Sequence, residues 1–334
     1  MLRLIENEVL KIVYRKKLLF VAVIITILVL LFAYGQYVQS EQANERIMKR
    51  LAIEEIDDWR VYVEQQWLEH RQRLDNPYLT DERRARLQVE VEQYAYYLEH
   101  DINPNVVGSA TFTKTFMEQS MFMLYPLLVM LLVTDIITGE FSGRTVKLLL
   151  TKPLARWKIL LSKMLAMVIM VTLLIIMLVL ISACISSMIF GYGGWNAPMI
   201  TGFSVVNGSL DVSQVVSVAQ WELILMICGL AWIVGIVVGA LTMMVSVLVQ
   251  NTGAVIGIMM LSLIAGSFLN FFLSDWQAIK YLFSVNLNIA GYLSGAVQPI
   301  EGMSFLFSIT VLAVWAIGAV VTSFVTFNRQ DMLV

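Results

Sequence analysis

Runs of about 20 apolar residues recur along this chain and dominate its pattern. Each run is long enough for a helix to cross the hydrocarbon core of a bilayer, which takes about 20 residues. We place predicted spans at 18–37, 116–137, 160–190, 223–249, 254–272 and 305–328. The pattern therefore predicts an all-α integral membrane protein with about six transmembrane helices.

Composition agrees with this fold class. Hydrophobic residues make up 58% of the chain and charged residues only 14%, and the mean hydropathy is +0.75, which excludes an ordinary soluble globule. The two cysteines, Cys184 and Cys228, fall within the third and fourth predicted spans. We interpret both as packing residues and predict no disulfide and no metal site.

The distribution of Lys and Arg predicts the orientation. Basic residues concentrate before the first span and in the segment 138–159, and Arg329 begins the tail 329–334. The segments 191–222 and 273–304 contain a single basic residue, Lys280. Because basic loops stay on the cytoplasmic side, we expect a multi-pass plasma-membrane protein with both termini in the cytoplasm.

Residues 1–17 form a predicted amphipathic helix. Apolar residues fall on one helical face, and charged residues surround them. The apolar set is Leu2, Leu4, Ile5, Val9, Ile12 and Val13. This pattern favours a helix on the cytoplasmic membrane surface that contacts lipid headgroups. The alternative is that these residues only begin the first span a few turns early.

Residues 38–115 form the one sizeable polar region, and we predict an extracellular helical hairpin there. Two stretches have helical periodicity: Ile56, Trp59, Val63, Trp67 and Leu74, and then Leu87, Val91, Tyr94 and Leu98. Thr80 is the expected N-cap of the second helix. Residues 38–105 hold fifteen acidic and nine basic residues, a net charge of −6. This surface either gathers a cationic substrate or accessory protein, or serves only to keep the hairpin soluble.

Two later segments leave alternatives open. Residues 191–222 are rich in turn-forming residues and are expected to be an extracellular loop. Residues 273–304 are only moderately apolar, so they form either an extracellular loop or a short re-entrant segment before the last span.

The basic segment between the second and third spans carries the most informative order of residues. An acid is followed by a Gly-Thr-like turn, an apolar cluster, a Thr-x-Pro, an Arg and a closing Lys. These are Glu140, Gly143 with Thr145, Leu148 to Leu150, Thr151 with Pro153, Arg156 and Lys163. Over residues 135–163 the order resembles the cytoplasmic signature of ABC-2-type permeases. Arg144, Lys147 and Ser162 depart from the usual pattern, which bears on the subfamily and the cargo.

The resemblance implies that this segment docks onto a separate ATPase subunit. Residues Thr145 to Thr151 are expected to form a short coupling helix that Pro153 ends, with apolar residues toward the membrane. The implied contact set is Glu140, Gly143, Arg144, Thr145, Leu149, Pro153, Arg156 and Lys163. The alternative is a basic loop that only sets the topology.

Nothing in the sequence indicates catalysis by this chain. Gly139 to Thr145 superficially resembles a phosphate-binding loop, but it is one residue short and has Arg in place of Lys. We therefore predict no enzyme activity and no bound cofactor, with ATP and Mg²⁺ held by the partner ATPase. Ionisable residues are nearly absent from the middle of the spans, which favours a motor outside the membrane over an ion gradient. No nucleic acid is expected as a partner.

Small residues at helical spacing predict close helix contacts. They are Ala231, Gly235 and Gly239 in the fourth span, and Gly253 and Gly257 at the start of the fifth. Packing within one subunit and contact between two subunits are both open. Tyr125-Pro126 predicts a kink in the second span, because proline lacks the N–H of a helical hydrogen bond.

These observations predict the permease subunit of an ABC exporter, in which two identical or related copies form the pathway. The alternative is a membrane scaffold or sensor that binds a partner through the hairpin. The cargo is open among peptides, drugs, lipid-linked glycans and cations; the acidic hairpin leans toward a cationic one. The resemblance implies a bacterial source.

Overall fold

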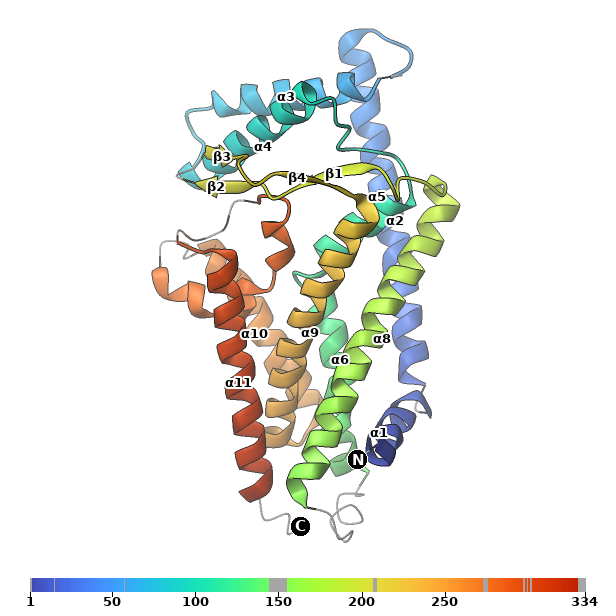
Figure 1. Ribbon diagram of the computed structural model, residues 1–334, viewed down its shortest axis with the longest axis vertical. Helices are drawn as coiled ribbons and strands as arrows, with labels where there is room; N and C mark the ends of the chain where they lie inside the picture. Colours follow the sequence, from blue (N-terminus) through green and yellow to red (C-terminus); the bar gives the residue numbers. More distant parts are fainter. Residues whose placement is uncertain are drawn as a thin grey trace.

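The structure is a computed structural model, which describes residues 2–14, 16–56, 58–143, 155–206, 209–272, 276–296, 298, 300 and 302–329. It is an elongated helical bundle (Figure 1). Helix α1 (Leu2–Tyr14) and the last turn of α11 (Phe305–Arg329) lie at one end, which we call the base. A helical hairpin lies at the opposite end, which we call the hairpin end.

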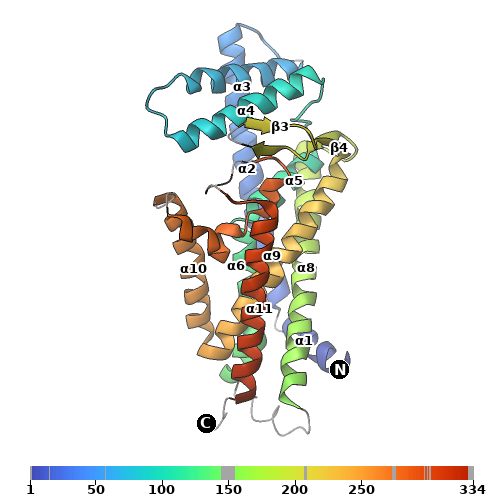
Figure 2. The same ribbon diagram turned by 60° about the vertical axis from the view of Figure 1, so that its left-hand side comes forward.

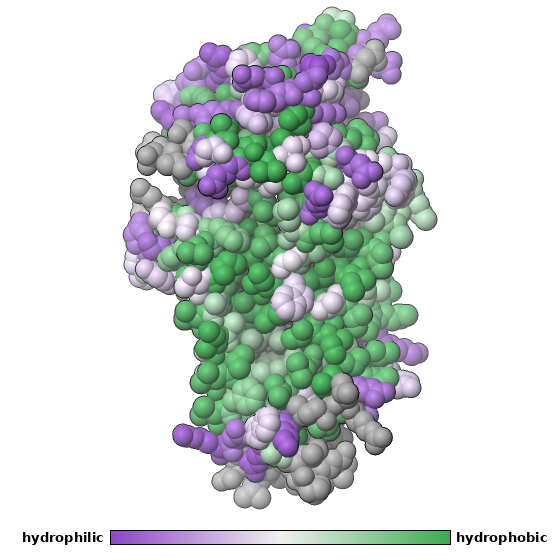
Figure 3. All heavy atoms as spheres, viewed as in Figure 1, coloured by the Kyte–Doolittle hydropathy of each residue, from purple (hydrophilic) through white to green (hydrophobic). Residues whose placement is uncertain are grey.

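Within the described residues, six helices are long and apolar enough to cross a membrane. They are α2 (Lys17–Leu51), α6 (Leu124–Ser142), α8 (Arg156–Phe190), α9 (Gln220–Val249), α10 (Thr252–Phe272) and α11. On the face seen in Figure 3, mostly apolar residues cover the middle of the molecule, and polar residues gather toward its two ends. The prediction of an all-α integral membrane protein with six spans is confirmed.

The first and third spans are longer than their apolar runs. Helices α2 and α8 each contain 35 residues. Helix α2 continues 14 residues beyond the predicted end at 37, through Gln, Glu, Ala, Arg and Lys residues that favour helix without requiring an apolar environment. Residues 38–51, which we predicted to belong to the hairpin region, are therefore an extension of the first span.

The second span differs from its prediction. Instead of one kinked helix over 116–137, the chain forms α5 (Ser109–Ser120), a turn at 121–123, and then α6. Pro126 is the third residue of α6, in the first turn, where backbone N–H groups have no helical partner. The break therefore precedes the proline, which fits an ordinary helix start.

The predicted helical hairpin is confirmed as α3 (Trp59–Leu74) and α4 (Asp81–Glu99). The Thr80 side chain accepts a hydrogen bond from the Arg83 N–H, as expected of an N-cap. Asp58 caps α3 in the same way through the Arg60 N–H. Figure 2 shows the two helices lying across the hairpin end, above the strands.

Residues 191–222 contain short strands that the sequence analysis missed. Strand β1 (Pro198–Thr201) pairs with β4 (Val216–Ala219), and β2 (Ser204–Val206) pairs with β3 (Ser209–Asp211), both antiparallel. Their Val, Ile and Thr content suits strands. Because each strand has only three or four residues, it leaves too short a pattern to detect.

Residues 277–292 fold as three short 3₁₀ helices, η1 (Gln277–Tyr281), η2 (Phe283–Asn286) and η3 (Ile289–Tyr292). Five apolar side chains of this segment are buried: Ile279, Phe283, Leu287, Ile289 and Ala290. Trp315 on α11 donates its indole N–H to the Tyr281 carbonyl at 2.9 Å. The described part of 273–304 therefore packs against the bundle. The extracellular loop and the re-entrant segment both stay predictions.

Two small residues of α9 explain the close contact of α6, α8 and α9. A Cβ on Gly235 would lie 2.1 Å from the Tyr125 hydroxyl oxygen and 2.6 Å from Val171 Cγ1, and one on Gly239 would lie 2.6 Å from Met167 Sδ. Ala231 is fully buried in the same core. These three predicted packing residues thus pack within the subunit.

The other small-residue pair behaves differently. A Cβ on Gly257 would meet nothing within 4 Å, and one on Gly253 would meet only the neighbouring Asn251 side chain, at 3.5 Å. Gly253 and Gly257 therefore face outward from the described part of the subunit. Their predicted role in contact between subunits stays a prediction.

We expect Gly235→Ala to lower stability by about 1–3 kcal/mol, because the new methyl group overpacks a closed contact. The control is Gly229→Ala on the same helix, where a Cβ meets nothing within 4 Å. Thermal unfolding of the purified protein should show a lower midpoint for Gly235→Ala than for Gly229→Ala. Equal midpoints would contradict this packing.

Candidate functional site

Helix α1 is a separate helix at the base and not an early start of the first span. Lys16 has a positive φ of 56°, and this left-handed turn redirects the chain before α2 begins. Ile12 and Glu8 are buried against the bundle, whereas Leu10, Val13 and Tyr14 are exposed. One side of α1 therefore packs against the bundle, and the other side is exposed.

Lys163 is the most unusual side chain at the base, because it is only 1% exposed and yet ionisable. Its ammonium lies 2.9 Å from Glu8 Oε2, 2.9 Å from Glu140 Oε1 and 2.7 Å from the Ile136 carbonyl oxygen. A lysine ammonium has three N–H donors. Lys163 therefore donates two hydrogen bonds, to Glu8 and to the Ile136 carbonyl, and forms an ion pair with Glu140. These partners come from α1 and α6, while the lysine itself is on α8.

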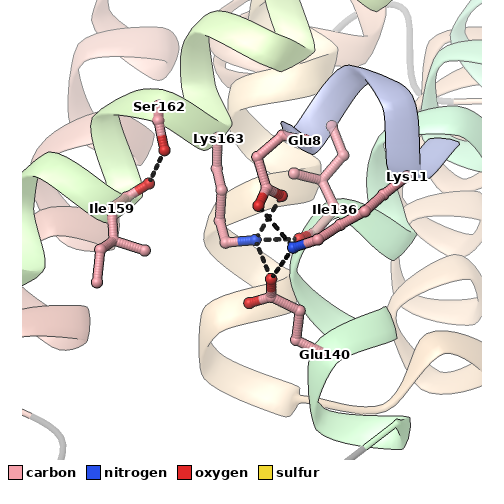
Figure 4. A network of polar contacts seen from close by, with 7 residues as sticks. All are labelled: Glu8, Lys11, Ile136, Glu140, Ile159, Ser162 and Lys163. Carbon is pink, nitrogen blue, oxygen red and sulfur yellow. Dashed lines mark hydrogen bonds and ion pairs between the residues drawn. The ribbon is translucent and has the colours of Figure 1, made fainter. Parts of the chain in front are cut away.

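Lys11 completes the arrangement from α1. Its ammonium lies 2.8 Å from Glu8 Oε1 and 3.0 Å from Glu140 Oε1. Figure 4 shows the two carboxylates and two ammonium groups converging between α1, α6 and α8. We call Glu8, Lys11, Glu140 and Lys163 the charge cluster. Its formal charges sum to zero, so each buried charge is compensated within the cluster.

The protonation states of the two α1 residues follow from these contacts. Burial alone would raise the pKa of Glu8, but the charge of Lys163 and the hydrogen bonds from Lys11 and Lys163 outweigh it, and the pKa is lowered. Burial alone would lower the pKa of Lys11, but its contacts with Glu8 and Glu140 outweigh it, and the pKa is raised. Both groups therefore stay charged near neutral pH.

A second ion pair lies next to the charge cluster. Lys17, the first residue of α2, pairs with Asp135 on α6. A small hollow separates this pair from the cluster, lined by Glu8, Lys11, Ile12, Lys17, Asp135, Ile136 and Glu140. Helices α1, α2, α6 and α8 are thus joined at the base by ionic contacts.

The charge cluster stabilises the packing of α1 against α6 and α8 only when all four charged groups are present. Charges removed from water cost several kcal/mol each, and the cost is offset when every charge is paired and hydrogen-bonded. Removing one partner of a buried pair typically costs about 3–5 kcal/mol, because the other charge stays buried without compensation. The cluster therefore specifies one position of α1 against α6 and α8.

The structure brings together two of the predicted site residues, Glu140 and Lys163. Gly143 ends α6, with its N–H directed to the Gly139 carbonyl at 3.2 Å. Arg156 begins α8 and donates to the Asn328 carbonyl of α11 at 3.3 Å, apart from the cluster. The other four predicted residues, Arg144, Thr145, Leu149 and Pro153, lie outside the described residues, as does the predicted coupling helix.

The sequence analysis missed Glu8 and Lys11 as site residues. The available signal was an acid and a base three positions apart on a predicted amphipathic helix, which places both on one face. That signal does not reveal partners more than a hundred residues away. Asp135 lies near the end of the predicted span 116–137, and the sequence analysis did not pair it with Lys17.

Most of the chain matches a known protein family. A family model described as a protein of unknown function, DUF2705, matches residues 86–333. This range includes Glu140 and Lys163, whereas α1 and α2 precede it.

Two relatives from Bacillus subtilis (strain 168) are similar to the chain. An uncharacterized protein, YhcI, is 25% identical over 71% of this chain and 74% of its own length. An uncharacterized membrane protein, YdbK, is 25% identical over 69% of this chain and 85% of its own length.

We expect Glu8→Gln to release α1 from the base, because Lys163 and Lys11 both lose an anionic partner. Amide hydrogen exchange across residues 4–14 should become at least about tenfold faster, since a tenfold change corresponds to only about 1.4 kcal/mol and a broken buried pair exceeds that. The control is Glu6→Gln, an exposed acid on the same helix, which should leave exchange unchanged. Equal exchange in both variants would show that the cluster does not hold α1.

Proposed function

We propose that this chain, which belongs to the DUF2705 family of proteins of unknown function, is the transmembrane subunit of an ATP-driven ABC exporter. The observation that carries the proposal is the order of residues from Glu140 to Lys163, which resembles the cytoplasmic signature of ABC-2-type permeases. In this proposal two copies, identical or related, form the pathway. A separate ATPase binds ATP and Mg²⁺ and drives the cycle.

The contacts at the base support this proposal mechanically. Glu140 lies near the end of α6 and Lys163 near the start of α8, and their charged groups are 2.9 Å apart. The segment that connects these helices therefore has both ends fastened together. A force applied to such a segment moves α6 and α8 as a pair and does not spread its ends apart.

Helix α1 extends the same unit toward the membrane surface. Because Glu8 contacts Lys163 and Lys11 contacts Glu140, a displacement of α6 and α8 carries α1 with it. The exposed apolar side chains Leu10 and Val13 suit contact with lipid. In the proposed cycle, α1 is the part of the permease that slides along the membrane surface when the ATPase moves.

The distribution of charge along the spans also favours an external motor. In α6 and α8 the Asp, Glu, Lys and Arg residues are within the half of the helix nearest the base, and α10 has none. Proton or ion relays in secondary transporters need ionisable groups at mid-membrane depth. The spans offer an apolar interior that suits an amphiphilic cargo.

Binding of the ATPase is tested by purifying the tagged chain gently from its native membrane and identifying co-purifying proteins by mass spectrometry. We expect a nucleotide-binding subunit with the native chain and a loss of at least about tenfold with Arg144→Ala or Pro153→Ala. Lys280→Ala, a basic residue at the other end of the bundle, is the control. If no ATPase accompanies the native chain and a protein bound through the hairpin does, the scaffold function replaces the exporter.

The proposed orientation, with the base in the cytoplasm of a plasma-membrane protein, has its own test. Gln88→Cys, on α4, should react with a membrane-impermeant thiol reagent in intact cells. Lys158→Cys, near the base, should react only after permeabilisation. The reverse order of labelling would place the hairpin in the cytoplasm and exclude the proposed topology.

A further inference from the structure

The second helix of the hairpin, α4, contacts two other segments at the hairpin end. The Glu92 carboxylate accepts a hydrogen bond from the Leu210 N–H of β3 at 2.7 Å, and the Gln93 amide donates to the Ser294 carbonyl at 3.0 Å. These partners are far apart in the sequence. Helix α4 therefore holds the strand region and the turn after η3 together at the hairpin end, as Figure 2 shows for β3.

An aromatic contact reinforces this attachment. The Phe203 ring meets Tyr96 and Tyr97 edge to face, at centroid distances of 5.4 and 6.0 Å. Gly295, with a φ of +68°, lies so close that a Cβ there would be 2.4 Å from Phe203 Cβ. Helix α4 is thus fixed to the bundle by polar and aromatic contacts, and none of these contacts involves α3.

Helix α3 is held to α4 through a titratable contact. His70 on α3 lies mostly buried, with Nε2 3.2 Å from Glu90 Oε2 on α4 and Nδ1 2.7 Å from the Gln66 carbonyl oxygen. A neutral imidazole has one N–H and can donate to only one of these acceptors. The imidazolium has two N–H groups and satisfies both.

The other charged groups around His70 leave Glu90 as its main electrostatic partner. On α3, Arg73 lies nearby and pairs with Glu69 at 3.8 Å, and Arg50 of α2 pairs with Glu69 at 3.1 Å. From α4, the Tyr94 ring packs 5.5 Å from the imidazole. Burial raises the pKa of Tyr94 to about 12, so this phenol stays neutral.

We propose that His70 and Glu90 form a pH-dependent ion pair. Protonation of His70 strengthens the contact between α3 and α4, so the hairpin is more stable at acidic pH. Neutralising His70 removes one charged contact between the two helices, while the attachment of α4 to the bundle is unaffected. The hairpin can then loosen at α3 without leaving the hairpin end. This inference requires nothing of the proposed exporter function.

The sign of the pH dependence follows from the contacts. The hydrogen bond with Glu90 raises the pKa of His70; burial opposes it, and the Gln66 carbonyl adds to it, and the result lies above the usual 6.5. A group with a raised folded-state pKa stabilises the fold fully below its unfolded pKa, and this contribution is lost as pH rises through the folded value. The contribution of His70 to the stability of the hairpin should therefore be greatest below about pH 6.5 and fall as the pH rises through its raised pKa.

The experiment is amide hydrogen exchange of the full-length chain in lipid nanodiscs at pH 5.5 and 8.5, corrected for intrinsic exchange rates. Amides of α3 should be about two- to fivefold less protected at pH 8.5, the range for a partly exposed ion pair. In His70→Gln the ratio of protection at pH 5.5 to protection at pH 8.5 should fall to about one. His100→Gln, which removes the other histidine of this region, should keep the native ratio.

A second variant covers the outcome in which His70→Gln loosens the hairpin at every pH. Glu90→Gln retains the histidine but removes its anionic partner, so the pH ratio should again fall to about one. If the ratio of α3 protection at the two pH values were equal in the native chain and both variants, the proposed pH-dependent ion pair would be wrong. A native ratio of one would contradict it as well.

Discussion

The ammonium of Lys163 is the constraint on which the base of this structure depends. This lysine is only 1% exposed, and burying an ammonium group is costly unless hydrogen bonds and opposite charges replace the lost water. Here the partners are a carboxylate of α1, a carboxylate of α6 and a main-chain carbonyl of α6. Satisfying one side chain thus fixes the relative positions of three helices.

The three levels of the molecule are held by different interactions. At the base, buried charges specify one arrangement, because an incomplete cluster is costly. In the middle, Gly235 and Gly239 let α9 approach Tyr125 and Met167, so contact depends on shape, as is usual where lipid replaces water. At the hairpin end, single hydrogen bonds and edge-to-face aromatic contacts join segments that are distant in the sequence. The base therefore joins α1, α6 and α8 as one unit, and the hairpin end includes the contact between His70 and Glu90 that we propose to depend on pH.

Much of this fold is predictable from the sequence, because span length and apolar content are local properties. The six spans, the hairpin and the Thr80 cap all follow from residues within one helix length of each other. The strands at 198–219 and the break before Leu124 do not, because they depend on short segments and on contacts with distant loops. The sequence also does not stop α2 at residue 37, since helix propensity persists after apolarity ends.

The site was predictable only in part, for a related reason. The order of residues from Glu140 to Lys163 marks both as candidate site residues, but their pairing depends on α6 and α8 lying side by side. Glu8 is 155 residues from Lys163, and no periodicity connects them. An acid on an amphipathic helix looks like a surface residue until the helix is seen packed against a buried lysine.

A double-mutant cycle between Glu140 and Lys163 tests the central claim most directly, through the unfolding free energies of Glu140→Gln, Lys163→Met and the double variant. The account predicts that each single change destabilises the protein strongly and that the double variant loses at least about 1.5 kcal/mol less than the sum, because no uncompensated charge of this pair remains. Additive effects within about 0.5 kcal/mol would contradict it. The two residues would then be independent, and the base would not act as one unit.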